Sequence, residues 1–103
     1  MIHVVATITL KPGTRAAFLD VFRWLTPQVR AEAGCIEYQA AIDLPTTIAV
    51  QVPLRADVVT VIEKWESLEA LAAHFQAPHM LEYRAKVKDY VVSVKLVVSE
   101  AAF

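Results

Sequence analysis

The chain has 103 residues, a formal net charge of −1 and one cysteine, and 56% of its residues are hydrophobic. This length fits a single domain over residues 1–103, and the singly scattered charges exclude the basic surface of a nucleic-acid-binding protein. The lone Cys35 excludes an internal disulfide. No apolar run approaches the ~18 residues of a membrane span, and MIHVVATITLKPG lacks the features of a signal peptide, so we expect a cytoplasmic protein without membrane contact.

The hydrophobic content exceeds the usual ~45–50% of globular domains. A domain of this size buries only about two-thirds of the surface that its unfolded chain exposes. We therefore expect a homodimer, in which a second copy of the chain covers the remaining apolar surface.

The first half of the chain predicts a strand, a helix and a second strand. Residues 2–10 alternate and are rich in β-branched side chains, as in a strand covered on both faces. After a Lys-Pro-Gly turn, apolar residues recur at helical spacing: Phe18, Val21, Phe22, Leu25 and Val29. Pro27 is expected to kink this helix, and Gly34 to end it in the left-handed conformation. Residues 35–42 alternate again and predict the second strand.

Residues 43–57 are ambiguous. Pro45 and Pro53 restrict the chain near both ends, and apolar side chains alternate between them: Ile48, Val50, Val52 and Leu54. The segment is either a short edge strand or an apolar arm, since its Ile and Val content disfavours a disordered excursion. We expect an arm that packs over a subunit interface or over the mouth of a pocket.

The second half predicts a strand, helical segments and a last strand. Residues 58–65 form the strand, Ser67 caps a helix, and Pro78 begins a further helical piece that ends near Asp89. The expected inward stripe of the first helix is Leu68, Leu71, Ala72 and Phe75. Residues 90–99 complete a βαββαβ order, which is the ferredoxin-like α+β fold: an antiparallel sheet with its helices on one face.

Trp65 and Glu63 share one face of the third strand. Trp65 is either a core residue or a pocket wall that stacks on a flat substrate. A carboxylate in this apolar strand needs a partner or a proton, so the pKa of Glu63 is expected to rise if the side chain is buried. The alternative is an exposed residue at the strand end.

His74 and His79 are candidates for an acid or base, although a histidine at the edge of a buried stripe is often only a hydrogen-bonding residue. Their i, i+5 spacing across Pro78 does not match a metal-binding pair, and no third ligand is evident, so we expect no metal. The candidates for substrate contacts are Glu63, Tyr38, Tyr83 and Phe75, with core packing as the alternative for the three aromatic residues.

Two segments resemble the antibiotic biosynthesis monooxygenase-like family, which includes quinol monooxygenases: VRAEAGCIEY (29–38) and EKWESLEALAAHFQAPHM (63–80). The resemblance implies a dimeric α/β barrel with a pocket between sheet and helices, bordered by Trp65, His74 and His79. Haem-degrading relatives carry asparagine, tryptophan and histidine at positions that align here with Thr7, His74 and Arg84. This difference argues against haem, and we expect no cofactor.

The resulting hypothesis is a cofactor-independent monooxygenase for a small phenolic, quinol or polyketide-like aromatic, with O2 as second substrate. Trp65 would contact the substrate, and His74 or His79 would accept its proton. A small-molecule carrier and a proton-transfer isomerase with the same pocket remain alternatives, since one fold hosts many functions.

Overall fold

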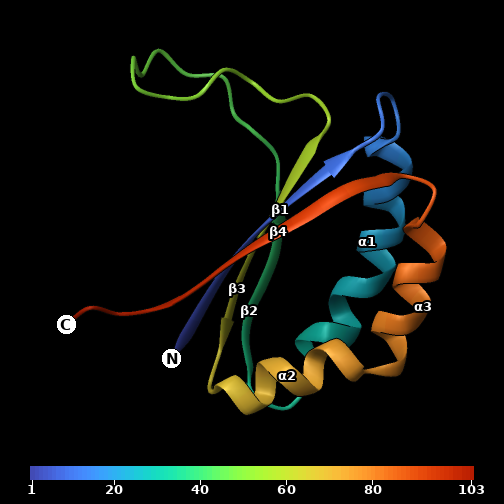
Figure 1. Cartoon of the computed structure of the whole chain (residues 1–103), viewed down its shortest axis with the longest axis vertical. Helices are drawn as coiled ribbons and strands as arrows, with labels where there is room; N and C mark the ends of the chain where they lie inside the picture. Colours follow the sequence, from blue (N-terminus) through green and yellow to red (C-terminus); the bar gives the residue numbers. More distant parts are fainter.

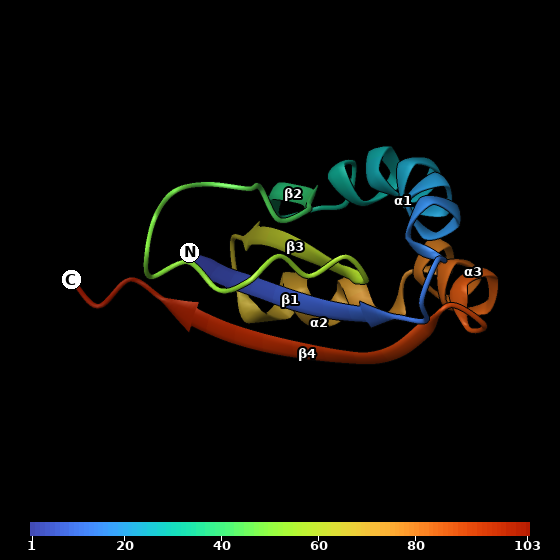
Figure 2. The same cartoon turned by 90° about the horizontal axis from the view of Figure 1, so that it is seen from above.

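The computed structural model describes all 103 residues and contains seven helices and strands. In chain order these are β1 (Ile2–Leu10), α1 (Arg15–Arg30), β2 (Cys35–Ala41), β3 (Val58–Trp65), α2 (Leu68–Gln76), α3 (Pro78–Val87) and β4 (Val91–Glu100). The strands form one antiparallel sheet in the order β2-β3-β1-β4 (Figure 2). All three helices lie on the same side of it (Figure 1). The predicted ferredoxin-like fold is confirmed.

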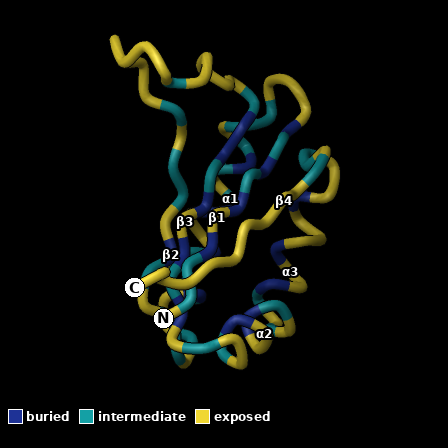
Figure 3. The backbone as a smooth tube through the Cα atoms, turned by 60° about the vertical axis from the view of Figure 1, so that its left-hand side comes forward, coloured by how far each residue is buried: buried dark blue, intermediate teal, exposed yellow.

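The core lies between the helices and the central strands. Alternate residues of β1 are buried toward the helices, and α1 presents a stripe to meet them: Phe18, Phe22, Leu25 and Val29. Burying each such side chain contributes about 1.5–3 kcal/mol. The tube in Figure 3 is dark along this layer but light along β4, most of which is exposed. The buried layer therefore ends before the β4 edge of the sheet.

Local signals fix the beginnings of α2 and α3. The Ser67 hydroxyl accepts a hydrogen bond from the N–H of Ala70 at 3.1 Å, and Pro78 occupies the first turn of α3. The predicted stripe of α2 was wrong at two positions, because Leu68 and Ala72 are exposed. α2 begins at the end of the sheet, so its first turn has no strand to cover it (Figure 1). The buried residues are instead Leu71 and His74.

The reversal from α1 into β2 brings the end of α1 against α2. Gly34 has φ of +82°, and a Cβ on it would lie 2.6 Å from the Cβ of Ala70. Its carbonyl also accepts the N–H of Glu66 at 2.9 Å. Only glycine satisfies both the left-handed backbone and this close approach. The contact places residue 32, just before the reversal, beside the end of α2.

Residues 43–57, which we call the arm, form no strand, so the edge-strand alternative was wrong. The arm leaves the sheet at the end opposite α2 (Figure 1). Its large apolar side chains are exposed in the single chain: Leu44, Ile48, Val50, Val52 and Leu54. The guanidinium of Arg55 bonds both oxygens of Asp43 at 2.9 Å, which joins the two ends of the arm.

None of the three helices has the combination of length and apolar character that crossing a bilayer requires.

Candidate active site

A cavity of about 230 Å³ lies between the sheet and the helices. Its thirteen lining residues are mostly apolar and come from all four strands and all three helices: Ala6, Ile8, Phe22, Tyr38, Val61, Glu63, His74, Phe75, Met80, Tyr83, Arg84, Val94 and Leu96. Val94 and Leu96 of β4 are exposed and form the less covered side of the cavity. Such a pocket, apolar with a few convergent polar groups, is the form expected of a small-molecule site.

Five of the seven side chains singled out from the sequence line this cavity: Tyr38, Glu63, His74, Phe75 and Tyr83. Trp65 and His79 do not. Trp65 is fully buried, and its indole N–H donates to Oε1 of Glu63 at 2.9 Å. The indole therefore lies behind Glu63, and the expectation that Trp65 forms the wall on which a substrate stacks does not match this geometry.

Glu63 is a buried carboxyl on the cavity wall, with 5% of its surface exposed. Burial raises its pKa to about 7; the Trp65 hydrogen bond lowers the pKa, and the negative charge of Glu32 raises it. Near neutral pH, Glu63 can therefore either donate a hydrogen bond as an acid or accept a proton as a carboxylate.

His74 is almost completely buried, with 1% of its surface exposed. Its ring centroid lies 4.7 Å from that of Trp65 and 5.3 Å from that of Phe75, and Tyr38 meets it edge-on at 5.5 Å. Burial lowers its pKa, although the hydrogen bond and charge of Glu32 oppose this shift. The imidazole is thus held in place and kept neutral, which is the state of a base that is ready to accept a proton.

Glu32 is the site residue that the sequence analysis missed. Its Oε2 lies 2.9 Å from Nδ1 of His74 and 2.7 Å from Nε2 of His79. No spacing rule connects Glu32 with histidines more than 40 residues later in the chain. The sequence held two signals: Glu32 lies within VRAEAGCIEY (29–38), a segment that carries the family resemblance, and it stands just before the Gly34 reversal.

Tyr38 and Tyr83 provide phenol groups at the cavity. Tyr38 stacks on Phe22 with centroids 5.4 Å apart, and Tyr83 meets the same ring edge-on at 6.1 Å. Burial raises the pKa of both phenols, so they stay protonated and can donate hydrogen bonds. No buried side-chain nitrogen or oxygen lacks a partner. Neither hydroxyl bonds to the protein, so neither is fully covered, and both tyrosines line the cavity.

The remaining reactive groups lie elsewhere or form no ligand set. His, Cys, Asp and Glu side chains form no group of three or more that could hold a metal ion. Burial raises the pKa of the Cys35 thiol, and Cys35 does not line the cavity. The polar side chains that line the cavity are the carboxyl, imidazole and phenol groups described above and the guanidinium of Arg84.

Comparisons with known proteins identify the family and support the fold. Residues 1–86 match the family described as "Antibiotic biosynthesis monooxygenase". "Probable quinol monooxygenase YgiN" of Escherichia coli K12 is 37% identical over 98 residues, which cover 93% of each chain. The crystal structure of PA3566 from Pseudomonas aeruginosa superposes with a TM-score of 0.82 at 26% identity, over 99% of this chain and 94% of that one.

The structure of Rv0793 from Mycobacterium tuberculosis gives a TM-score of 0.80 at 24% identity, over 99% of this chain and 95% of the other, and supports the fold. The family match spans most of the chain, and the similarity to YgiN extends over nearly all of it. The chain belongs to the antibiotic biosynthesis monooxygenase family.

Proposed function

We propose that the protein is a cofactor-independent monooxygenase that acts on a small phenolic, quinol or polyketide-like aromatic. One observation carries the proposal: Glu63, whose pKa is about 7, and the neutral imidazole of His74 line the same aromatic cavity. The family supports a monooxygenase-like function, and the name of YgiN supports a quinol as substrate.

The cavity favours a small, flat substrate. Its ~230 Å³ is less than the ~300–1,000 Å³ of sites for drug-sized ligands, which suits one or two aromatic rings. Phe22 and Phe75 provide apolar ring surfaces, and the hydroxyls of Tyr38 and Tyr83 can donate hydrogen bonds to substrate oxygens. Apolar walls also exclude water from a reactive anion.

The proposed reaction begins with proton removal. His74 accepts a proton from the substrate hydroxyl, and the resulting phenolate is electron-rich enough to reduce O2. A ring carbon then forms a C–O bond with the reduced oxygen, giving a peroxide on that carbon. Cleavage of the O–O bond releases water and leaves a carbonyl. For a quinol, the sum is quinol plus O2 to hydroxyquinone plus water, and the substrate supplies all four electrons.

In this scheme Glu63 supplies the proton that is needed when the O–O bond breaks. As a neutral acid, it can donate a proton to the oxygen that leaves as water, and the pKa of about 7 allows it to be reprotonated near neutral pH. Trp65 acts through Glu63, because its N–H holds the carboxyl on the cavity wall.

Oxygen uptake tests the proposal directly. Metal-stripped protein is given menadiol and a panel of polyketide-like phenols, and we expect O2 consumption above the buffer rate. His74→Gln should lower kcat by about 10²–10⁴-fold, as for the loss of a general base. His3→Gln is the matched control, since His3 lies on β1 but does not line the cavity.

No consumption above buffer across the whole panel would contradict the proposal. Conversion of a carbonyl compound at the same rate without oxygen would indicate an isomerase. A ligand retained through purification, with no turnover change in Trp65→Phe or His79→Ala, would indicate a carrier.

A further inference from the structure

Three elements meet behind the cavity wall at a single carboxylate oxygen. Glu32 comes from the turn after α1, His74 from the last turn of α2 and His79 from the first turn of α3. Nδ1 of His74 and Nε2 of His79 both lie within 3 Å of Oε2 of Glu32, at 2.9 and 2.7 Å. The side chain of Glu32 is largely buried, with 13% exposed, so water does not compete freely for this oxygen.

These contacts assign the hydrogen on His74. An ionised carboxylate only accepts hydrogen bonds, so the nitrogen that contacts it must carry the proton. Nδ1 of His74 is therefore the N–H, and Nε2 is the bare acceptor of the neutral ring. Nε2 bonds to no protein group. Because every fully buried side-chain nitrogen has a hydrogen-bond partner, Nε2 is not fully covered. His74 lines the cavity, which is the space that this nitrogen would face in the arrangement proposed next.

We propose that Glu32 is a positioning residue for the reaction: it fixes the His74 tautomer so that Nε2 faces the substrate, and it stabilises the imidazolium formed when His74 accepts the proton. His79 donates to the same oxygen and keeps the carboxylate in position beside His74. The effect on turnover rests on the proposed monooxygenase function, whereas the tautomer is a property of the resting protein.

Other groups also act on His74, and they set what a Glu32 variant should show. Titratable and charged side chains face it from every neighbouring element: Glu32, Tyr38, Glu63, His79, Tyr83 and Arg84. Glu32 raises the pKa of His74, and its charge also raises that of Glu63. Removing this charge should lower both pKa values together, which measures the electrostatic effect of Glu32 on the site.

The first test is the tautomer in the wild-type protein. Two-bond ¹H–¹⁵N correlation spectra of ¹⁵N-labelled protein distinguish a protonated Nδ1 from a protonated Nε2. We expect the Nδ1–H form for His74. An Nε2–H form, with a bare Nδ1, would overturn the proposal whether or not the protein turns over any substrate.

The second test uses two variants and a control. Glu32→Gln keeps an acceptor oxygen but removes the charge, so the tautomer should persist while the pKa values of His74 and Glu63 fall. Glu32→Met removes the acceptor, so the Nε2–H form should become populated and kcat should fall by about 10–100-fold, the range typical of carboxylates that orient a metal-bound histidine. Glu37→Gln, which removes an ion pair with Lys64 on β3, should change none of these.

The outcomes separate the two proposals. If no substrate consumes O2 but the Nδ1–H tautomer depends on Glu32, the positioning stands and the monooxygenase assignment fails. If O2 is consumed and Glu32→Met keeps both kcat and the tautomer, the positioning role is wrong. If Glu32→Met does not fold, the wild-type tautomer and the Glu32→Gln titration decide the question.

Discussion

Glu63 and His74 have opposite charges when ionised, yet burial shifts both pKa values in the direction that favours the neutral form of each side chain. It raises the pKa of the acid to about 7 and lowers that of the base. Near neutral pH the cavity therefore holds a group close to its titration point beside a neutral imidazole. A neutral substrate enters such a site without a large electrostatic penalty, and both groups can take part in proton transfer.

The raised pKa of Glu63 makes a prediction about stability. The acid is protonated more readily in the folded state than in the unfolded chain, where its pKa is near 4.5. The contribution of Glu63 to the free energy of unfolding is therefore fully present below about pH 4.5 and is lost as the pH rises through about 7. Glu63→Gln cannot ionise and does not suffer this loss. Between about pH 4 and pH 8, the free energy of unfolding of the variant should therefore rise by about 3 kcal/mol relative to that of the wild type.

Urea unfolding of both proteins across this pH range measures the difference. Glu37→Gln serves as the control, because Glu37 lies half-buried beside Lys64 on the strand next to Glu63. A constant difference between Glu63→Gln and wild type at all pH values would show that Glu63 titrates normally.

For single residues, strand alternation predicted which residues share a face of the sheet, but not how deeply each side chain is buried. It predicted that Glu63 and Trp65 share one face of β3; the structure shows that this face is buried, and the raised pKa of Glu63 follows from the burial. Alternation could not show that the cavity stops short of Trp65, because depth depends on the side chains packed above. Glu32 was beyond reach for a related reason: its partners are set by how α1 and α2 pack, which no local pattern encodes.

At the level of elements, the turn between α1 and β2 connects the fold to the site. The close approach of Gly34 to Ala70 holds this turn against α2, and Glu32 lies two residues earlier in the chain. The histidines contact Glu32 from the end of α2 and the start of α3. The geometry of the site is thus only as firm as the packing of this turn.

The two glycines offer a matched test of that packing. Both have positive φ, +79° at Gly13 and +82° at Gly34, so alanine is conformationally strained at each. A Cβ at Gly13 meets nothing within 4 Å, whereas one at Gly34 would meet Ala70 at 2.6 Å. Gly13→Ala should cost about 1–2 kcal/mol from the backbone alone, and Gly34→Ala about 1–3 kcal/mol more from overpacking.

Denaturant unfolding gives the two costs, and the His74 tautomer reports on the site. We expect Gly34→Ala to disturb the Glu32 contact and Gly13→Ala to leave it intact. Equal losses of stability in the two variants would show that α2 yields easily and that the turn is not a tight contact.

The elements themselves were largely predictable because their signals are local. Period-two and helical spacing, Ser67, Pro78 and Gly34 predicted the boundaries of most strands and helices. Leu68 and Ala72 were misplaced because a stripe is read from spacing, whereas exposure depends on where the helix ends relative to the sheet. The arm alternates like a strand, but no neighbouring strand pairs with it in this chain.

At the scale of the whole molecule, much apolar surface has no cover within one chain. Val5, Ile62 and Val97 lie on the sheet face without helices, and the registers of β1 with β3 and β4 place them side by side. The side of the cavity formed by Val94 and Leu96 is also exposed. A second copy that covers these surfaces would complete the pocket as well as bury the sheet.

We therefore predict an obligate homodimer at micromolar concentration. Sedimentation should give a species of about 23 kDa, twice the 11.4 kDa of one chain. Ile62→Lys should weaken this species because it places a charge on the bare sheet face. Leu81→Lys changes an exposed leucine on α3 and should leave the dimer intact. A folded species of about 11 kDa in the wild type would contradict the prediction.

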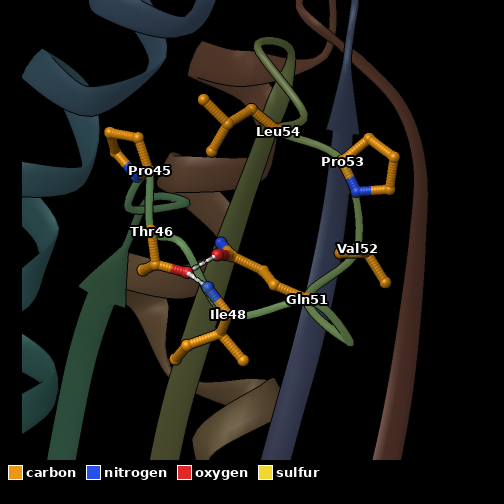
Figure 4. Close-up of a pocket in the computed structure, with 7 residues that line it drawn as sticks. All are labelled: Pro45, Thr46, Ile48, Gln51, Val52, Pro53 and Leu54. Atoms are coloured by element: carbon orange, nitrogen blue, oxygen red, sulfur yellow. Dashed lines mark hydrogen bonds between the residues drawn. The ribbon is translucent and has the colours of Figure 1, made fainter.

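The arm is held by hydrogen bonds within itself, although its large apolar side chains are exposed in the single chain. Polar groups hold it together from within: Gln51 contacts Thr46, and Ile48 donates its N–H to Thr46 (Figure 4). Gln51 also donates to the carbonyl of Leu44 at 2.7 Å. The side chains of Ile48 and Val52 point away from these contacts. No arm residue lines the cavity of its own chain. We therefore predict that the arm covers the surface of a partner subunit.

Amide exchange distinguishes a packed arm from a loose one. Within residues 46–54 of the single chain, only the N–H groups of Ile48 and Gln51 donate to the protein, and the ion pair of Asp43 with Arg55 is a surface contact of little stabilising value. Slow exchange across 46–54 would therefore have to come from packing on the second copy. We expect it in the wild-type dimer and expect it to be lost in Ile62→Lys. Shortening the arm should then alter substrate preference, as for a segment that closes a partner's pocket. Fast exchange throughout 46–54 in the intact dimer would show that the arm covers nothing.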